Sequence, residues 1–205
     1  MESWLACSKE NSNATLENPN NLSEDKAFIE LTTETYDYLL FISSRVKTNN
    51  LSLPLIKAQL STLESKKLHF AEQMASIDII FKGNLSKRLN EHMNAYKRNW
   101  ENIKLRYNKI SQEVLEKECA EVLANRYKKQ KNLQNVAQRY AVPVCGWRYY
   151  LCSGAATAGA ILCHAGCDTT ALATTAGLGI PVCVALCGTL QVSAIVLCSD
   201  SYCAL

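Results

Sequence analysis

Residues 145–203 read CGWRYYLCSGAATAGAILCHAGCDTTALATTAGLGIPVCVALCGTLQVSAIVLCSDSYC and hold eight of the 10 cysteines in the 205-residue chain. These cysteines nest around a centre near residue 175, so each one before the centre has a counterpart almost equally far after it. Residues related in this way lie at the same height on the two arms of an antiparallel hairpin. The nesting therefore predicts four disulfides, Cys145–Cys203, Cys152–Cys198, Cys163–Cys187 and Cys167–Cys183.

The spacing along each arm favours α-helices. Cys163 and Cys167 follow Cys152 by 11 and 15 residues, and these steps rotate only about 20° and 60° beyond whole helical turns. The second arm repeats the spacing in reverse from Cys198. The outermost pair requires a non-helical end, because Cys203 would lie about 140° off the stripe in a continued helix.

The arms are apolar on every side. Within residues 153–197 the only fully charged side chain is that of Asp168, and most of the rest are Ala, Gly, Thr, Leu, Ile and Val. A two-helix hairpin buries one face of each arm, so we expect most of this surface to meet a membrane or a protein partner. Clustered, paired cysteines are typical of oxidising compartments and hold a unit together without a large core. The sequence predicts a secreted or cell-envelope protein.

The chain before residue 142 is polar, basic and helix-rich, and this change of composition marks a domain boundary. We expect residues 1–23 to be disordered, because Asn and Ser dominate and no apolar period is visible. Residues 24–131 are predicted to form an up-down bundle of three helices, of which the third is long. Residues 132–144 are a linker and a candidate cleavage region. The helices are expected over residues 24–47, 52–83 and 85–131.

The predicted fold class is therefore all-α, a three-helix bundle followed by a disulfide-laddered apolar hairpin. The first helix should be capped by Ser23 and should bury a stripe that consists of Phe28, Leu31, Thr35, Tyr38, Leu39 and Ile42. Cys7 and Cys119 lie outside the ladder.

Enzymatic chemistry finds little support. None of the three histidines neighbours an acid and a nucleophile in a recognisable pattern, and Cys163-His164 is more typical of a surface histidine between two half-cystines than of a protease pair. No phosphate loop, dinucleotide fingerprint or paired-carboxylate motif is present. We expect no enzyme, no cofactor and no nucleic-acid partner, since the basic residues 126–131 are typical of a solvated helix end.

Three alternatives for the hairpin remain open. Cys163, Cys167, Cys183 and Cys187 could bind zinc as thiolates, but the other four cysteines in the same register would then be unexplained. The same twin Cys-x3-Cys pairs resemble small chaperones of the mitochondrial intermembrane space, from which the extra pairs and uncharged arms depart. A transmembrane hairpin is the third alternative, because each arm approaches spanning length, about 20 residues.

Residues 145–203 also resemble the halocin-type cysteine-rich bacteriocins, above all in LCHAGC at residues 162–167 and GLGIPVC at residues 177–183. Members of that family are small, disulfide-rich, apolar antimicrobial peptides released from the carboxyl end of a precursor, whose preceding part can confer immunity. The resemblance implies that residues 145–205 are a bacteriocin domain freed by a processing protease. Residues 24–131 would then be a pro-region or immunity module that masks it.

The partner that this resemblance implies is the membrane of a competing cell. Aromatic residues beside Arg148 are typical of interfacial anchors, and the arms would supply the apolar insertion. We expect membrane contact through Trp147, Tyr149, Tyr150, Leu162, Leu172, Val184, Leu186, Ile195 and Leu197.

The amino terminus bears on export. Residues 1–8 lack the apolar run of a secretory signal, whereas residues 4–8 resemble the end of a bacterial lipoprotein signal, with Cys7 as the lipidation site. The alternative function is a non-toxic envelope or membrane protein whose hairpin is a structural or partner-binding module.

Overall fold

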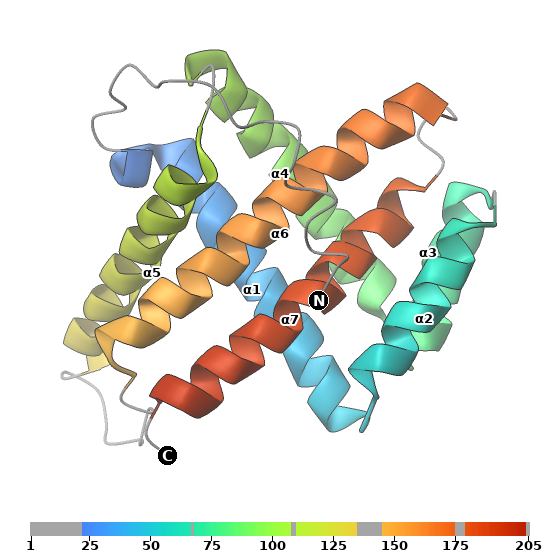
Figure 1. The fold of residues 1–205 in the computed structure, drawn as a ribbon, viewed down its shortest axis with the longest axis horizontal. Coiled ribbons are helices and arrows are strands. Elements are labelled where there is room, and N and C mark those ends of the chain that lie inside the picture. The colour runs from blue at the N-terminus through green and yellow to red at the C-terminus, as the bar shows by residue number, and fades with distance from the viewer. Residues whose placement is uncertain (1–21, 67, 108–109, 135–144, 175–178, 204–205) are drawn as a thin grey trace.

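The computed structural model describes residues 22–66, 68–107, 110–134, 145–174 and 179–203 (Figure 1). Within these ranges it has seven α-helices, one short 3-10 helix and no strand, only an isolated bridge between Cys145 and Cys203. The all-α prediction is confirmed. The elements are η1 (Leu22–Glu24), α1 (Lys26–Thr48), α2 (Leu53–Glu64), α3 (Phe70–Ile80), α4 (Leu85–Arg106), α5 (Gln112–Gln134), α6 (Trp147–Thr174) and α7 (Ile180–Tyr202).

Helix α1 forms where the sequence predicts it, and its whole predicted apolar stripe is buried. Its cap is Asp25 rather than Ser23. The Asp25 carboxylate accepts hydrogen bonds from the backbone N–H groups of Ala27 at 2.8 Å and Phe28 at 3.2 Å, which satisfies donors that the first helical turn leaves unpaired. The backbone N–H of Ser23 instead donates to Glu118 on α5 at 2.8 Å.

The prediction of three helices in residues 24–131 is wrong, because five form there. The second predicted helix divides into α2 and α3, and a capping box between His69 and Glu72 begins α3. The third divides into α4 and α5, because Tyr107 has extended backbone (φ −124°, ψ 99°). At this break Arg106 and Tyr107 both contact the Asp25 carboxylate, at 3.0 and 3.3 Å. The division lets α5 leave α4 and lie along α6 (Figure 1).

The α6–α7 hairpin occupies the middle of the molecule. Figure 1 shows the two arms side by side, with α1 and α4 behind them, α5 along α6, and α2 and α3 along α7. Two hydrophobic cores join the hairpin to the N-terminal helices α1–α5. In one, Ile42 and Leu89 pack with Ile195; in the other, Leu31 and Val122 pack with Ile161.

The expectation that most of the hairpin's apolar surface lacks an intramolecular partner is therefore wrong. The N-terminal helices are amphipathic, and the hairpin takes up much of the apolar surface that they would otherwise expose. Both arms are also longer than residues 154–174 and 181–197, where the sequence predicts them, because α6 begins at Trp147 and α7 extends to Tyr202. Gly179 begins α7 with a φ of 113°, a left-handed conformation that glycine adopts without strain.

Candidate functional site: the disulfide-bonded hairpin

The structure contains the four disulfides that the cysteine positions predict. In the three helical pairs the Cα atoms lie 5.6 to 5.8 Å apart, within the usual range for a disulfide. The outermost pair, at 4.2 Å, uses the non-helical end that the helical phase requires, because Cys203 has extended backbone (φ −104°, ψ 125°). Covalent bonds thus join the two arms at four heights.

The two inner disulfides lie against each other. Sγ of Cys167 is 3.7 Å from Sγ of Cys187, although each belongs to a different bond. Together with Cys183 they place three sulfurs within 4.8 Å of one another. Such a cluster would suit a soft metal as thiolates, but these sulfurs are consumed in disulfides, which favours the ladder over the zinc alternative.

Small residues on the hairpin allow the N-terminal helices to approach closely. A Cβ atom at Gly154 of α6 would lie 2.6 Å from the backbone N and Cα of Ala120 on α5. A Cβ at Gly188 of α7 would lie 2.7 Å from Cδ1 of Ile42 and 2.9 Å from Cε1 of Tyr38 on α1. Gly154 and Gly188 therefore serve contacts within the chain, in addition to any role in a membrane.

Polar contacts fix the hairpin at two points. The hydroxyl groups of Tyr36 on α1 and Tyr149 on α6 form a hydrogen bond, and Tyr150 packs its ring 5.4 Å from that of Tyr127 on α5. Deeper in the molecule, the Tyr96 hydroxyl on α4 donates to the backbone carbonyl of Ile161 at 2.8 Å. The phenol of Tyr149, predicted to anchor in a membrane interface, is thus engaged within the protein.

A buried pair of histidines links α4 to α6. Nε2 of His92 lies 3.3 Å from Nδ1 of His164, and the two side chains are 0% and 1% exposed. The prediction that His164 lies on the surface is wrong, because this histidine faces α4 inside the molecule. The Tyr38 ring stacks on His92 with 4.2 Å between ring centroids, and Tyr96 meets His164 edge to face at 5.3 Å.

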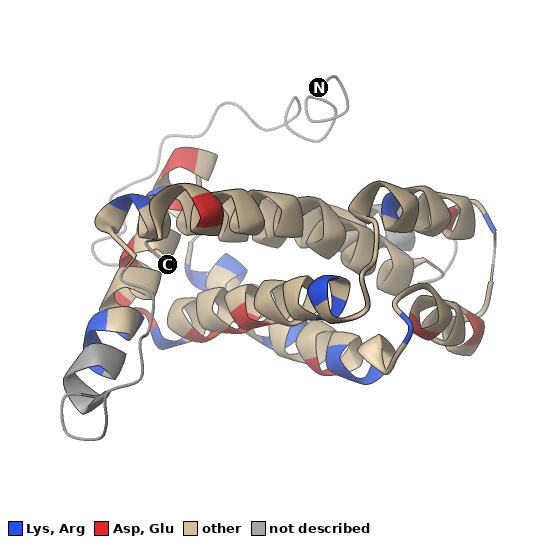
Figure 2. Cartoon of the chain, turned by 90° about the horizontal axis from the view of Figure 1, so that it is seen from below, with Lys and Arg blue, Asp and Glu red and all other residues tan. Residues whose placement is uncertain are grey.

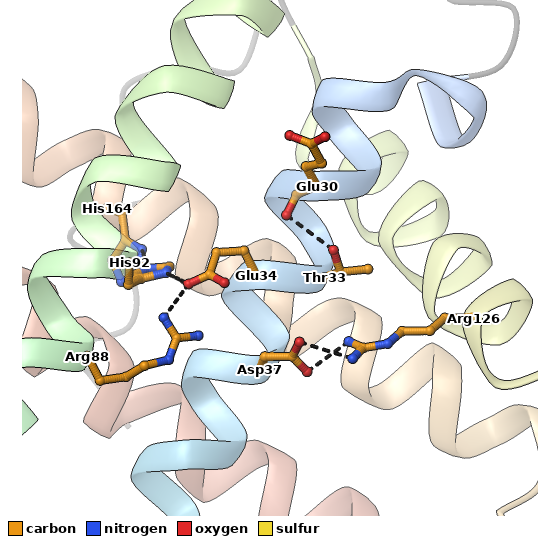
Figure 3. Close-up of polar contacts among 8 residues, drawn as sticks. All are labelled: Glu30, Thr33, Glu34, Asp37, Arg88, His92, Arg126 and His164. Carbon is orange, nitrogen blue, oxygen red and sulfur yellow. Dashed lines mark hydrogen bonds and ion pairs between the residues drawn. The ribbon is translucent and has the colours of Figure 1, made fainter. Parts of the chain in front are cut away.

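Glu34 on α1 contacts His92 of this pair and forms an ion pair with Arg88 on α4 (Figure 3). Oε1 of Glu34 lies 3.4 Å from Nδ1 of His92 and also binds the guanidinium of Arg88. Burial alone would raise the pKa of Glu34, but hydrogen bonds from His92 and Arg88 and their charges outweigh it and lower that pKa to about 2. The Glu34 carboxylate is therefore ionised across the ordinary pH range.

The same surroundings disfavour charge on the histidines. Burial lowers the pKa of His92, an effect that Glu34 opposes and Arg88 reinforces. Burial and the adjacent His92 ring place the pKa of His164 well below its usual range, while the backbone of Val184 on α7 opposes them only in part. Both rings are consequently neutral near pH 7.

The residues predicted to contact a membrane are divided in this conformation. Trp147 and Leu197 are 67% and 64% exposed, whereas Val184 and Ile195 are buried in the core shared with the N-terminal helices. The remaining described members are half-buried: Tyr149, Tyr150, Leu162 and Leu186. The Leu172 side chain, Cys7, residues 1–21 and residues 135–144 of the predicted cleavage region lie outside the described part of the structure.

The hairpin carries few charges, and Figure 2 shows α7 almost entirely without them apart from its carboxyl-terminal end. Arg148, Asp168 and Asp200 are the only fully charged residues of α6 and α7. Among the described helices, α7 alone is long and apolar enough to span a membrane. More than half of its apolar stretch is buried in the structure. Length and composition alone do not distinguish a membrane-spanning helix from the buried core helix of a water-soluble protein.

Cys119 on α5 is the one free cysteine of the described residues, and it is buried. Its thiol lies 3.6 Å from the hydroxyl of Thr32 on α1. Burial raises the pKa of this thiol to about 12, and the Thr32 contact reduces the rise only in part. The Cys119 thiol is thus protonated and inert in the closed molecule.

Comparison of the chain with known protein families, curated proteins and solved structures finds no match.

Proposed function

We propose that the chain is the precursor of a bacteriocin-type antimicrobial peptide, whose residues 145–205 are released to act on the membranes of competing cells. The observation that carries this proposal is the ladder of four disulfides along one apolar hairpin. Disulfides penalise the unfolded chain whether or not other helices cover the hairpin. The hairpin therefore has the means to stay folded after separation from the helices that now surround it.

Release would change the surface of the hairpin. In the closed molecule Val184, Val192 and Ile195 pack against the N-terminal helices, so separation uncovers them and adds to the exposed Leu197. Only three charged residues lie on the two arms. A contiguous apolar surface of this kind is costly in water and favourable in a bilayer.

The N-terminal helices α1–α5 would then serve as the pro-region. They cover the inner faces of α6 and α7, and by doing so keep a membrane-active surface from the producing cell. Processing within residues 132–144 by a protease would precede release. Disulfides persist in oxidising compartments, which supports a secreted or cell-envelope setting for the mature hairpin, with Cys7 as a candidate lipid anchor for the precursor.

Dye release from lipid vesicles tests this proposal. At pH 8, an oxidised peptide of residues 143–205 should release dye from vesicles of phosphatidylglycerol and phosphatidylcholine, whereas its reduced form and the intact chain should not. The reduced peptide is the matched control, because it has the same composition without the ladder. Absence of both dye release and growth inhibition by the oxidised peptide would refute the toxin function.

A second candidate function is a non-toxic envelope protein in which the hairpin is a structural or partner-binding module. The two shared cores favour it, because the hairpin forms the centre of the intact molecule. Mass spectrometry of the native protein separates the two candidates. A fragment that corresponds to residues 145–205 supports the precursor, and an intact chain as the only species supports the structural module.

A further inference from the structure

We infer that His92 and His164 form an acid-sensitive latch between α4 and α6, which holds the hairpin against the N-terminal helices near neutral pH and releases it when both rings become charged. This inference concerns the regulation of the hairpin and rests on the proposed function for its biological meaning. The latch itself is a property of the closed molecule and can be tested without any membrane.

The first step concerns where protons reside in the closed molecule. Glu34 lies beside Nδ1 of His92, so a proton on that nitrogen faces a carboxylate. Nε2 of His92 and Nδ1 of His164 then share a single proton across 3.3 Å. Nε2 of His164 is buried and has no hydrogen-bond partner among the described residues.

The second step concerns the effect of added protons. One extra proton can reside on His92, because the Glu34 carboxylate balances it. A second would charge His164 beside an already charged ring, and the backbone of Val184 would compensate for that charge only in part. Two like charges in contact within a buried site are strongly unfavourable. Arg88 adds a further positive charge to the same cluster.

The charged and titratable groups around the two rings come from every helix that packs on them. Helix α1 contributes Glu34 and the Tyr38 ring, α4 contributes Arg88 and the Tyr96 ring, and α7 contributes the backbone of Val184. Among the side chains that the structure describes around the rings, Glu34 is the only anion, and Arg88 already binds it. None of the described side chains therefore supplies a second anion to balance a second charged histidine.

The third step gives the direction of the pH dependence. A histidine in water takes up a proton below about pH 6.5, whereas burial depresses the pKa of both rings in the closed molecule. The open molecule therefore binds more protons below about pH 6.5, and the closed molecule loses stability as the pH falls from there. Glu34, with a pKa of about 2, stays ionised through this window.

The consequence is separation of α6 from α4, because His92 and His164 belong to different helices and water can reach both rings only when the helices part. The disulfides join α6 to α7 at four heights, so the hairpin leaves as one unit. Acid thus uncovers the inner face of the hairpin without disrupting the hairpin itself.

Hydrogen–deuterium exchange of the full chain tests the latch. Protection factors are measured for the amides of α4 and α6 between pH 8 and pH 5, each referred to the intrinsic rate at the same pH. The opening equilibrium constant should rise about 30-fold over this range for each histidine that gains a proton only in the open molecule. In His164→Gln, which keeps a polar side chain but cannot become charged, most of this rise should vanish.

His69→Gln is the matched control, since His69 is the exposed histidine at the start of α3, and this variant should keep the wild-type pH dependence. If His164→Gln fails to fold, His92→Gln replaces it. A wild-type chain with constant protection between pH 8 and pH 5 would overturn the latch. So would a glutamine variant that retains the full dependence.

A parallel measurement separates the latch from the toxin function. The full chain is mixed at pH 8 and pH 5 with dye-filled vesicles of phosphatidylglycerol and phosphatidylcholine, and leakage is expected only at pH 5. Loss of protection without leakage would support the latch and count against the membrane function. Leakage at pH 5 without loss of protection would contradict the latch.

Discussion

The hairpin and the helices around it are held together by different means. Helices α6 and α7 carry three disulfides and three fully charged residues, and a fourth disulfide joins Cys145 and Cys203 just outside them. In the described part of α1–α5, by contrast, ion pairs such as Asp37 with Arg126 (Figure 3) join the helices. The one free cysteine described there is Cys119. The dependence is therefore one-sided: the N-terminal helices need the hairpin to complete their cores, whereas the hairpin has covalent support of its own.

The largest effect is expected when the hairpin is removed. Residues 1–144 alone should show no cooperative thermal unfolding, because buried residues such as Leu39, Ile42 and Phe81 lose the apolar partners that α7 provides. Calorimetry and circular dichroism measure this, with the oxidised 145–205 peptide as the complementary control, which should keep helical signal. A cooperative transition in the 1–144 chain would show that the dependence is not one-sided.

Removal of one disulfide should destabilise the full chain and the isolated hairpin to different extents. The double substitution Cys152→Ala and Cys198→Ala should lower the free energy of unfolding of the full chain by about 2 to 4 kcal/mol. The isolated hairpin has little core to compensate, so its helical signal should be lost at a much lower urea concentration. Equal urea midpoint shifts in the two contexts would contradict the view that packing supports the hairpin in the closed molecule.

A substitution at a close helix contact should change the stability of the full chain and of the isolated hairpin peptide in opposite directions. Gly154→Ala should destabilise the full chain by about 1 to 3 kcal/mol, because its Cβ would collide with the backbone of Ala120. In the isolated peptide the same change should stabilise the helix, since alanine is the better helix former. Gly166→Ala is the control, because a Cβ there has nothing within 4 Å. Urea unfolding of both chains measures the signs, and a stabilised Gly154→Ala full chain would refute the contact.

The smallest effect is expected at the ion pair between α1 and α5. Arg126→Gln should cost at most about 1 kcal/mol, because the side chains of Arg126 and Asp37 are 34% and 41% exposed and water screens them. A double-mutant cycle with Asp37→Asn gives the coupling free energy, which should decrease further at high salt. A coupling well above 1 kcal/mol would mean that surface charge contributes more to the N-terminal helices than their exposure implies.

The sequence predicts the hairpin well because the positions of paired cysteines indicate directly which residues lie in contact. Cysteines that nest around one centre admit a simple pairing, and the helical phase of Cys152, Cys163 and Cys167 adds an independent constraint. No comparable sequence signal marks the breaks between α2 and α3, at residues 65–69, and between α4 and α5, at residues 107–111. Neither contains glycine or proline, and the second depends on contacts of Arg106 and Tyr107 with Asp25, 81 and 82 residues away.

The histidine pair also had no signal in the sequence. His92 and His164 are 72 residues apart, each within an ordinary helical pattern, and only the crossing of α4 with α6 brings them together. The same reason explains why the sequence predicts membrane contact for Val184 and Ile195. An apolar face looks alike in sequence whether lipid or another helix covers it, and here the covering helices lie more than 50 residues earlier in the chain.

The Cys145–Cys203 disulfide has a consequence for the durability of a released hairpin. It brings residues 58 positions apart to a Cα–Cα distance of 4.2 Å, and the N–H of Gly146 donates to the carbonyl of Tyr202 beside it. A fragment of residues 145–203 would be a covalently closed loop, because both of its terminal residues belong to this disulfide. Exopeptidases, which digest a chain from its termini, would be stopped within a few residues, so such a fragment should persist where linear peptides are degraded.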